Sequence, residues 1–233
     1  MRSLYLLIDL SSVLVPFIFS FHPKLQFYKK WKQAFVSISV TAIIFISWDV
    51  WFVKKGVWSF NPDYVLGIYF LGLPIEEILF FICIPYSCLF SYHALKVIFP
   101  KLNSHNTEPL FSFLLPIALI TLAFYFYPKI YTTVTFLFLA GYLLLLKIIY
   151  KPAWLDRFYF SFFIMLLPFF IVNGMLTGAG LDAAVVLYND EENAGLRLLT
   201  IPVEDIFYGM LFQLMNVSLF EFFSKRQTSF YLS

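Results

Sequence analysis

The chain has 233 residues, of which 61% are hydrophobic, 22% aromatic and only 13% charged. A soluble domain is about half apolar and about a quarter charged, so this composition excludes a water-soluble globule. The formal net charge of +2 is too small for a nucleic-acid-binding protein. Cys83 and Cys88 lie in an apolar run without metal-ligand companions. This excludes a disulfide scaffold and indicates two buried packing residues.

Seven apolar segments follow one another along the chain, and each approaches the roughly 20 residues that a helix needs to cross a bilayer core. The first segment is followed by charged residues rather than by a small-residue cleavage site, so we interpret it as a span and not as a signal peptide. The sequence predicts an all-α integral membrane protein with about seven transmembrane helices, at 3–21, 34–53, 74–98, 110–127, 130–149, 158–180 and 201–223.

Basic residues are shared unequally between the two sides of the predicted membrane domain. With seven spans, one set of alternate connectors and ends carries five Lys and Arg residues and the other set carries eleven. The positive-inside rule places the richer side in the cytoplasm. We therefore expect the N-terminus and the two longest connectors, 54–73 and 181–200, outside and the C-terminus in the cytoplasm.

An internal repeat organises the chain. The motif Leu-Pro-Ile-Glu-Glu-Ile at 73–78 recurs as Ile-Pro-Val-Glu-Asp-Ile at 201–206, and the same offset of 128 residues pairs Asn61 with Asn189. An ungapped offset over 18 residues indicates a duplicated three-helix unit with helix 110–127 as an addition. Four helices separate each helix from its copy, so the repeat is parallel. We assign 1–100 to the first repeat, 101–129 to a linker with one transmembrane helix, and 130–233 to the second repeat and a short C-terminal tail.

Each copy of the motif places a proline and two acids where an apolar helix is expected to begin. Proline and acids both suit a helix N-terminus, so simple helix capping is one interpretation. Function is favoured because the motif occurs twice and because an ionisable group inside a membrane is expensive and usually functional. The candidate catalytic acids are Glu76, Glu77, Glu204 and Asp205, supported by Pro74 and Pro202.

Further polar residues are expected in the same layer of the membrane. Asp49 lies near the outer end of the second predicted helix, between two tryptophans, and is either an interfacial solvated acid or a part of the site. Asp9, about two turns into the first helix, is interpreted as a structural hydrogen-bonding residue. Tyr208 follows Glu204 by four residues on the same helical face. The supporting residues are Asp49, Asn61, Asn189, Tyr208 and Asn173, the last of which we regard as structural more than catalytic.

Two other classes of function have been weighed against these residues. A membrane prenyltransferase would need regularly spaced Asp-rich motifs, magnesium and a Lys/Arg set for the diphosphate, and neither long connector carries that set. A transporter or scaffold could use the outer acids for a proton or a cation. Acids without histidine companions are a poor transition-metal site. The sequence has no dinucleotide-binding glycine motif, Walker loop or nucleophile elbow, so we expect neither a metal nor a cofactor.

The two three-helix units, each with Pro-x-Glu-(Glu/Asp), make the sequence resemble the heterodimeric-type lycopene cyclases. These are small membrane enzymes of some bacteria and archaea, and they also occur fused within bifunctional fungal carotenoid enzymes. Their two units are separate polypeptides or one chain, and this sequence looks like the one-chain form. The resemblance covers 3–225 and includes the approach Trp58-Ser59-Phe60-Asn61-Pro62. Asp190 stands where the first unit has Pro62, which leaves the catalytic equivalence of the units open.

The resemblance implies a lycopene β-cyclase, which closes the ψ ends of lycopene into β-ionone rings and yields γ-carotene and then β-carotene. It implies lycopene and other carotenoids as partners together with the lipid bilayer, no nucleic acid, no cofactor, and a bacterial cytoplasmic membrane as the location. The reaction needs a protonated acid, a base and a dry pocket, which two neighbouring buried carboxyls can provide. Aromatic faces stabilise a carbocation by roughly 0.5–2 kcal/mol each, and the candidate pocket residues are Phe80, Phe81 and Phe207.

Overall fold

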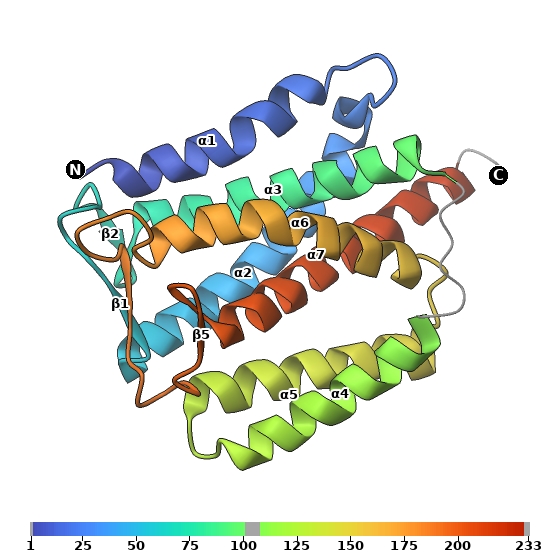
Figure 1. Cartoon of the computed structure of the whole chain (residues 1–233). Coiled ribbons are helices and arrows are strands. Elements are labelled where there is room, and N and C mark those ends of the chain that lie inside the picture. Colours follow the sequence, from blue (N-terminus) through green and yellow to red (C-terminus); the bar gives the residue numbers. More distant parts are fainter. Residues whose placement is uncertain (1, 101–107, 231–233) are drawn as a thin grey trace. The chain divides into compact units, whose positions relative to one another are not determined.

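The computed structural model describes residues 2–100 and 108–230 and consists mainly of long helices (Figure 1). Residues 101–107 of the predicted linker and 231–233 of the predicted tail lie outside the described residues. The predicted all-α class is confirmed. The helices of the described residues are α1 (Leu4–Phe19), α2 (Trp31–Lys55), α3 (Ile75–Ile98), α4 (Glu108–Tyr125), α5 (Ile130–Leu144), α6 (Leu155–Leu176) and α7 (Val203–Phe230), with η1 (Phe27–Lys30) before α2 and the π-helical η2 (Leu145–Tyr150) after α5.

The helices have the length and hydropathy of a membrane protein. Five helical segments of the described residues are long and apolar enough to span a bilayer, and α1 and the Phe111–Tyr125 part of α4 are shorter apolar helices. Leu14, Val15 and Ile18 on α1 are more than half exposed, as expected for side chains that face lipid. The five segments are Phe27–Lys55, Ile75–Ile98, Ile130–Tyr150, Leu155–Leu176 and Val203–Lys225.

Two predicted spans end or begin differently in the structure. The segment 158–180 was expected to be helical throughout, but α6 begins at Leu155 and ends at Leu176. Gly178 has a φ of 104°, a backbone conformation that stops a helix and that glycine adopts without a steric penalty. The segment 201–223 was expected to be helical from its first residue, but Ile201–Pro202 is a strand and α7 begins at Val203.

The chain divides into two compact units. Unit 1 comprises Met1–Lys55, Phe60–Pro100 and Phe212–Ser233, and unit 2 comprises Gly56–Ser59 and Lys101–Leu211. In unit 1, α3 packs against both α1 and α2, and in unit 2, α4 packs against α5 and α6. The first turns of α7 belong to unit 2 and its remainder belongs to unit 1.

Unit 1 has an aromatic core with polar contacts between its helices. The rings of Phe81 and Phe212 meet edge to face with centroids 5.4 Å apart, an arrangement that aromatic pairs favour. Thr41 Oγ1 donates to Asn216 Oδ1 at 2.9 Å, and Glu221 accepts from Tyr92 at 2.8 Å. Such hydrogen bonds hold membrane helices together where the hydrophobic effect gives no preference between lipid and protein.

The long connectors contain short antiparallel ladders that repeat with the offset found in the sequence. Tyr69 pairs with Pro74 in the first ladder, and Arg197 pairs with Pro202 in the second. These strands were not anticipated, because a strand of two residues shows no hydrophobic alternation. The strands are β1 (Trp58–Phe60), β2 (Tyr69–Phe70), β3 (Leu73–Pro74), β4 (Val186–Tyr188), β5 (Arg197–Leu198) and β6 (Ile201–Pro202).

The turn in each ladder positions the acid motif at the start of the following helix. Leu71 and Leu199 occupy equivalent turn positions with φ values of 53° and 59°. The helix after the turn is tied back to the connector, because Ile75 N donates to Ile68 O at 2.9 Å and Val203 N donates to Leu196 O at 3.0 Å. Pro74, in extended conformation, is the N-cap residue of α3, a place where its missing N–H is no loss.

Candidate functional site

The acids of the first motif lie in the first turn of α3 and are buried in unit 1. Glu76 is 0% exposed and Glu77 is 7% exposed. Oε1 of Glu76 accepts a hydrogen bond from Leu66 N at 2.6 Å, while its buried Oε2 has no hydrogen-bond partner among the described residues. Oε2 of Glu77 accepts from the hydroxyl of Tyr5, in the first turn of α1, at 2.5 Å. The motif is therefore held by both its connector and α1.

The acids of the second motif are buried in the same way in unit 2. Glu204 is 0% exposed and Asp205 is 5% exposed. Oε1 of Glu204 accepts from Ala194 N at 2.7 Å and from Thr132 Oγ1 at 2.5 Å. Oε2 of Glu204, like that of Glu76, is buried and has no hydrogen-bond partner within the described part of the chain. Each motif thus has one glutamate with an anchored oxygen and a second, unengaged oxygen.

Asp205 is surrounded by hydrogen-bond donors. Its Oδ1 accepts from Tyr131 at 2.6 Å, and its Oδ2 accepts from Asn173 at 2.6 Å and from Tyr188 at 2.8 Å. Hydrogen bonds to a carboxylate are shorter and stronger than those between neutral groups. The donors come from α5, α6 and β4, so they fix the orientation of this carboxyl group from three directions.

The two sites are built on one plan. Leu66 and Ala194, which donate to Glu76 and Glu204, are 128 residues apart. Tyr5 and Tyr131 are each the second residue of their helix, α1 and α5. Their backbone N–H groups donate to the connectors of the acid motifs, at Tyr64 O (3.2 Å) and Glu192 O (2.9 Å) respectively. The duplication therefore extends to the tyrosine that binds the second acid.

An aromatic cluster adjoins Asp205 in unit 2. Trp58 contacts Tyr131 at 5.2 Å, Tyr188 at 5.9 Å and Tyr208 at 6.2 Å between ring centroids. Tyr208 also lies 6.3 Å from Tyr131. The cluster therefore combines ring faces and edges next to a carboxyl group, an arrangement that can accommodate a developing cation.

The predicted supporting residues have different surroundings. Asp49 is buried on α2, so the interpretation of this acid as interfacial and solvated is wrong. Asn173 donates to Asp205 and lies in the second site. Asn61 and Asn189 hold their connectors, since their Oδ1 atoms accept from Asp63 N at 3.0 Å and from Glu191 N at 3.1 Å.

Asp9 contradicts its interpretation as a structural hydrogen-bonding residue. Its side chain is fully buried, yet neither carboxyl oxygen has a hydrogen-bond partner among residues 2–100 and 108–230. Asp9 interacts electrostatically with Glu77 and Glu76 instead. The first site therefore contains a third carboxyl group, which the sequence analysis left out.

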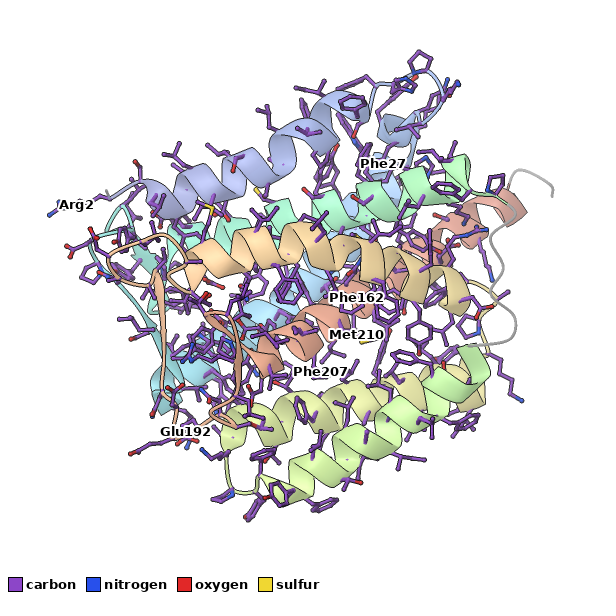
Figure 2. All side chains as sticks on the ribbon, viewed as in Figure 1. Arg2, Phe27, Phe162, Glu192, Phe207 and Met210 are labelled. Carbon is purple, nitrogen blue, oxygen red and sulfur yellow. The ribbon has the colours of Figure 1, made fainter. Side chains whose placement is uncertain are left out.

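The predicted pocket aromatics divide into core and site residues. Phe81 is buried against Phe212 and Phe45 in the core of unit 1. The ring of Phe80 lies 6.3 Å from that of Tyr5, which binds Glu77. Phe207, labelled on α7 in Figure 2, packs edge to face with Phe136 at 5.0 Å in unit 2. Of the two phenylalanines on α3, Phe80 is thus the neighbour of the acids.

Several residues of the two sites were missed in the sequence. Tyr188 could have been found, because it pairs with Phe60 at the repeat offset. Tyr5 and Tyr131 are 126 residues apart and so fall outside the 128-residue alignment. The missed residues are Tyr5, Trp58, Tyr131, Thr132 and Tyr188.

The acidic run of the second connector has a structural role. Oδ1 of Asp190 accepts from Asn193 at 3.1 Å and from Arg197 at 2.6 Å. These two hydrogen bonds, that from Asn193 first, lower the pKa of the Asp190 carboxyl. Among the described residues, no group of three His, Cys, Asp or Glu side chains is placed to hold a metal ion.

Comparison with known proteins points to one family. The model of the lycopene cyclase family matches residues 2–95 and 128–223. The bifunctional lycopene cyclase/phytoene synthase of Arthroderma gypseum is 31% identical over 74 residues, which are 31% of this chain and 12% of that protein. Those of Neurospora crassa and Aspergillus niger are 38% identical over 47 residues and 33% identical over 46, in each case 20% of this chain and 8% of the relative.

The matched part is thus a small fraction of each fungal relative. No solved structure matches the chain significantly. The family match is broader, because its two segments together cover well over half of the 233 residues and each contains one copy of the acid motif. The chain belongs to the lycopene cyclase family.

Proposed function

We propose that the chain is a lycopene β-cyclase, which converts the ψ ends of lycopene into β-ionone rings and yields γ-carotene and then β-carotene. Membership of the family supports a carotenoid substrate. The observation that carries the proposal is the buried glutamate at the start of α3 and of α7, whose Oε1 is anchored by a backbone N–H while its Oε2 has no hydrogen-bond partner in the described residues. An oxygen of this kind can hand a proton to a hydrocarbon that offers no hydrogen bond in return.

The chemistry needs only acid–base groups in a place without water. A proton adds to the terminal double bond, the tertiary cation is attacked by the neighbouring double bond, and a proton leaves to form the ring alkene. No electrons are transferred and the protons balance. Glu76 and Glu204 are the proposed proton-transferring acids, Glu77 and Asp205 are their catalytic partners, and Trp58 and Tyr208 offer aromatic surface to the cation.

The one-chain form of the heterodimeric type is the finer assignment within the family. Two family matches in a single chain support it, as does the repeated arrangement of Leu66 with Glu76 and Ala194 with Glu204. In this form both cyclase units come from one polypeptide. The chain alone then suffices for catalysis.

Expression in bacterial cells that accumulate lycopene tests the activity. The red pigment is expected to turn orange-yellow, and chromatography of the extract is expected to show γ-carotene early and β-carotene later. Cells that carry the empty vector are the control. Persistent lycopene in cells whose membranes contain the protein would contradict the proposal, and a requirement for a second cyclase polypeptide would contradict the one-chain form.

The domain boundaries and the orientation are proposed together. Residues 1–100 and 130–233 form the repeats, 101–129 form the linker with α4, and the protein lies in the cytoplasmic membrane with its N-terminus outside. The excess of Lys and Arg on one set of connectors supports this orientation.

Labelling of single cysteines in intact cells tests this topology. Cysteines placed in 54–73 and in 181–200 are expected to react with a membrane-impermeant reagent, because an odd number of helices separates each connector from its copy. Cysteines placed in 22–30 are expected to react only after the cells are permeabilised. If the connectors 54–73 and 181–200 label from opposite sides, the linker helix and the parallel repeat are both refuted.

A further inference from the structure

Asp9 is the most unusual ionisable group in unit 1. Its carboxyl group is 0% exposed, and both of its oxygens lack a hydrogen-bond partner in the described residues. It lies on α1, which packs against α3, and it interacts electrostatically with Glu77 and Glu76. A buried polar group without a hydrogen bond is destabilising, and a buried unpaired charge is far more so.

The other groups around Asp9 do not supply a positive charge. From α3 it faces Glu76, Glu77 and the thiol of Cys83. On α1 itself the nearest titratable group is Tyr5, whose hydroxyl donates to Glu77, and Tyr5 in turn interacts with Asp49 of α2. Three buried carboxyls that lie together without a cation cannot all be ionised, because the like charges repel and their desolvation is not offset.

The distribution of donors decides which carboxyl holds a proton. Glu77 accepts from Tyr5 and Glu76 accepts from Leu66 N, and both bonds stabilise a negative charge. Asp9 accepts no hydrogen bond in the described part of the chain. Of these three carboxyl groups, Asp9 therefore has the least to stabilise its anion.

The second repeat differs at the matching position. Counted from the tyrosine that binds the second acid, Thr135 on α5 stands where Asp9 stands on α1. Thr135 is also fully buried, and its Oγ1 has no hydrogen-bond partner in the described residues. A threonine hydroxyl does not exchange a proton near neutral pH, so a titratable group occupies this position in the first repeat alone.

We propose that Asp9 is the proton store of the first repeat: it holds a proton next to Glu76 and Glu77 and keeps that pair supplied with the proton that starts cyclisation. The proposal rests on the proposed cyclase function. Asp9 acts through the two glutamates and is thus a positioning residue. The cycle balances, because the proton lost from the cluster to the substrate alkene is replaced by the proton that leaves the cyclised cation.

Infrared spectroscopy of the full-length protein in membranes tests proton storage without reference to activity. The wild type is expected to show the carbonyl stretch of a protonated carboxylic acid, shifted by exchange into D₂O, and Asp9→Asn is expected to lose that band. Glu77→Gln, which leaves Asp9 in place, is expected to retain it. A band of unchanged intensity in Asp9→Asn would overturn the assignment of the proton to Asp9.

The pH profile of cyclisation separates a proton store from a packing residue. Asp9→Asn keeps the size of the side chain and is expected to lower the rate at neutral pH by roughly tenfold or more, within the range of acid–base contributions. Its activity is expected to recover as the pH is lowered, because Glu76 or Glu77 then takes up a proton directly. Asp9→Glu is expected to preserve the wild-type profile. A loss in Asp9→Asn that is equal at every pH would show a purely structural role and refute the proposal.

Two controls keep the outcomes distinct. Ser12→Ala, one turn further along α1, removes only a hydrogen bond to Asp9 O at 2.7 Å and is expected to behave as the wild type. Should the Asp9 variants fail to accumulate in membranes, the infrared comparison of the wild type with Glu77→Gln still decides, because loss of the band in Glu77→Gln would overturn the proposal. A wild type that shows the band but leaves lycopene unchanged would refute the cyclase function and not the stored proton.

Discussion

Replacement of Glu76 or Glu204 by glutamine is expected to slow the formation of cyclic carotenoids by roughly 10²–10⁴-fold, the usual contribution of an acid–base group. The amide keeps the shape of the side chain, and its oxygen can still accept the hydrogen bond from Leu66 N or Ala194 N. The change therefore removes proton transfer at Oε2 and leaves the anchoring of the connector intact. The protein is expected to accumulate in the membrane at the wild-type level.

The measurement is the rate at which lycopene is converted in isolated membranes, normalised to the amount of cyclase. Glu191→Gln is the matched control, because this acid is exposed on the second connector and its replacement is expected to leave the rate unchanged. The two site variants also report on the equivalence of the repeats, since a loss in only one of them assigns proton transfer to that repeat. Full activity in both variants would refute the proposed roles of these glutamates.

Replacement of Asp205 by alanine is expected to destabilise the protein strongly. Tyr131, Asn173 and Tyr188 all donate to this carboxyl group, and each buried donor that loses its acceptor costs about 1–3 kcal/mol. The combined loss is about 3 kcal/mol or more, a large part of the stability of an ordinary domain. We expect a markedly lower Tm in detergent and a smaller amount of folded protein in the membrane.

Asp205→Asn separates loss of the acceptor from loss of the charge. Its amide oxygen still accepts from Tyr131 or Tyr188, so its Tm is expected between those of the wild type and Asp205→Ala. Asp190→Ala is the surface control, because the bond of this acid to Arg197 is a partly exposed ion pair worth at most about 1 kcal/mol. Equal stabilities of Asp205→Ala and Asp205→Asn would show that the three donors find other partners.

The predicted elements that survive comparison with the structure are those with a strong local signal. Long apolar segments form helices because a chain in lipid must satisfy its backbone hydrogen bonds internally, and Ile75–Ile98 begins within one residue of its predicted start. The end of α6 was missed because the positive φ of Gly178 outweighs the hydropathy of the residues around it. The ladders in the connectors are too short to leave a pattern in the sequence.

The residues around the acids could be predicted only where the repeat carried them. Pro74 and Pro202 mark the start of each helix, and the shared offset identifies Glu76 with Glu204. Asp9 was misinterpreted, because an acid on an apolar helix normally has a hydrogen-bonding partner and the sequence does not show which face of the helix is buried.

The linear pattern of hydropathy, charge and duplication by itself determined a two-repeat membrane protein with paired acids at the start of two helices. Only the tertiary structure decided what those acids touch, because Tyr5 and Tyr131 reach them across 72 and 74 residues of chain. Contacts of that kind depend on which helix faces pack together, and packing is set by the fit of many side chains at once rather than by any local periodicity. The same packing buries Asp9 among carboxyls and makes the first repeat chemically different from the second.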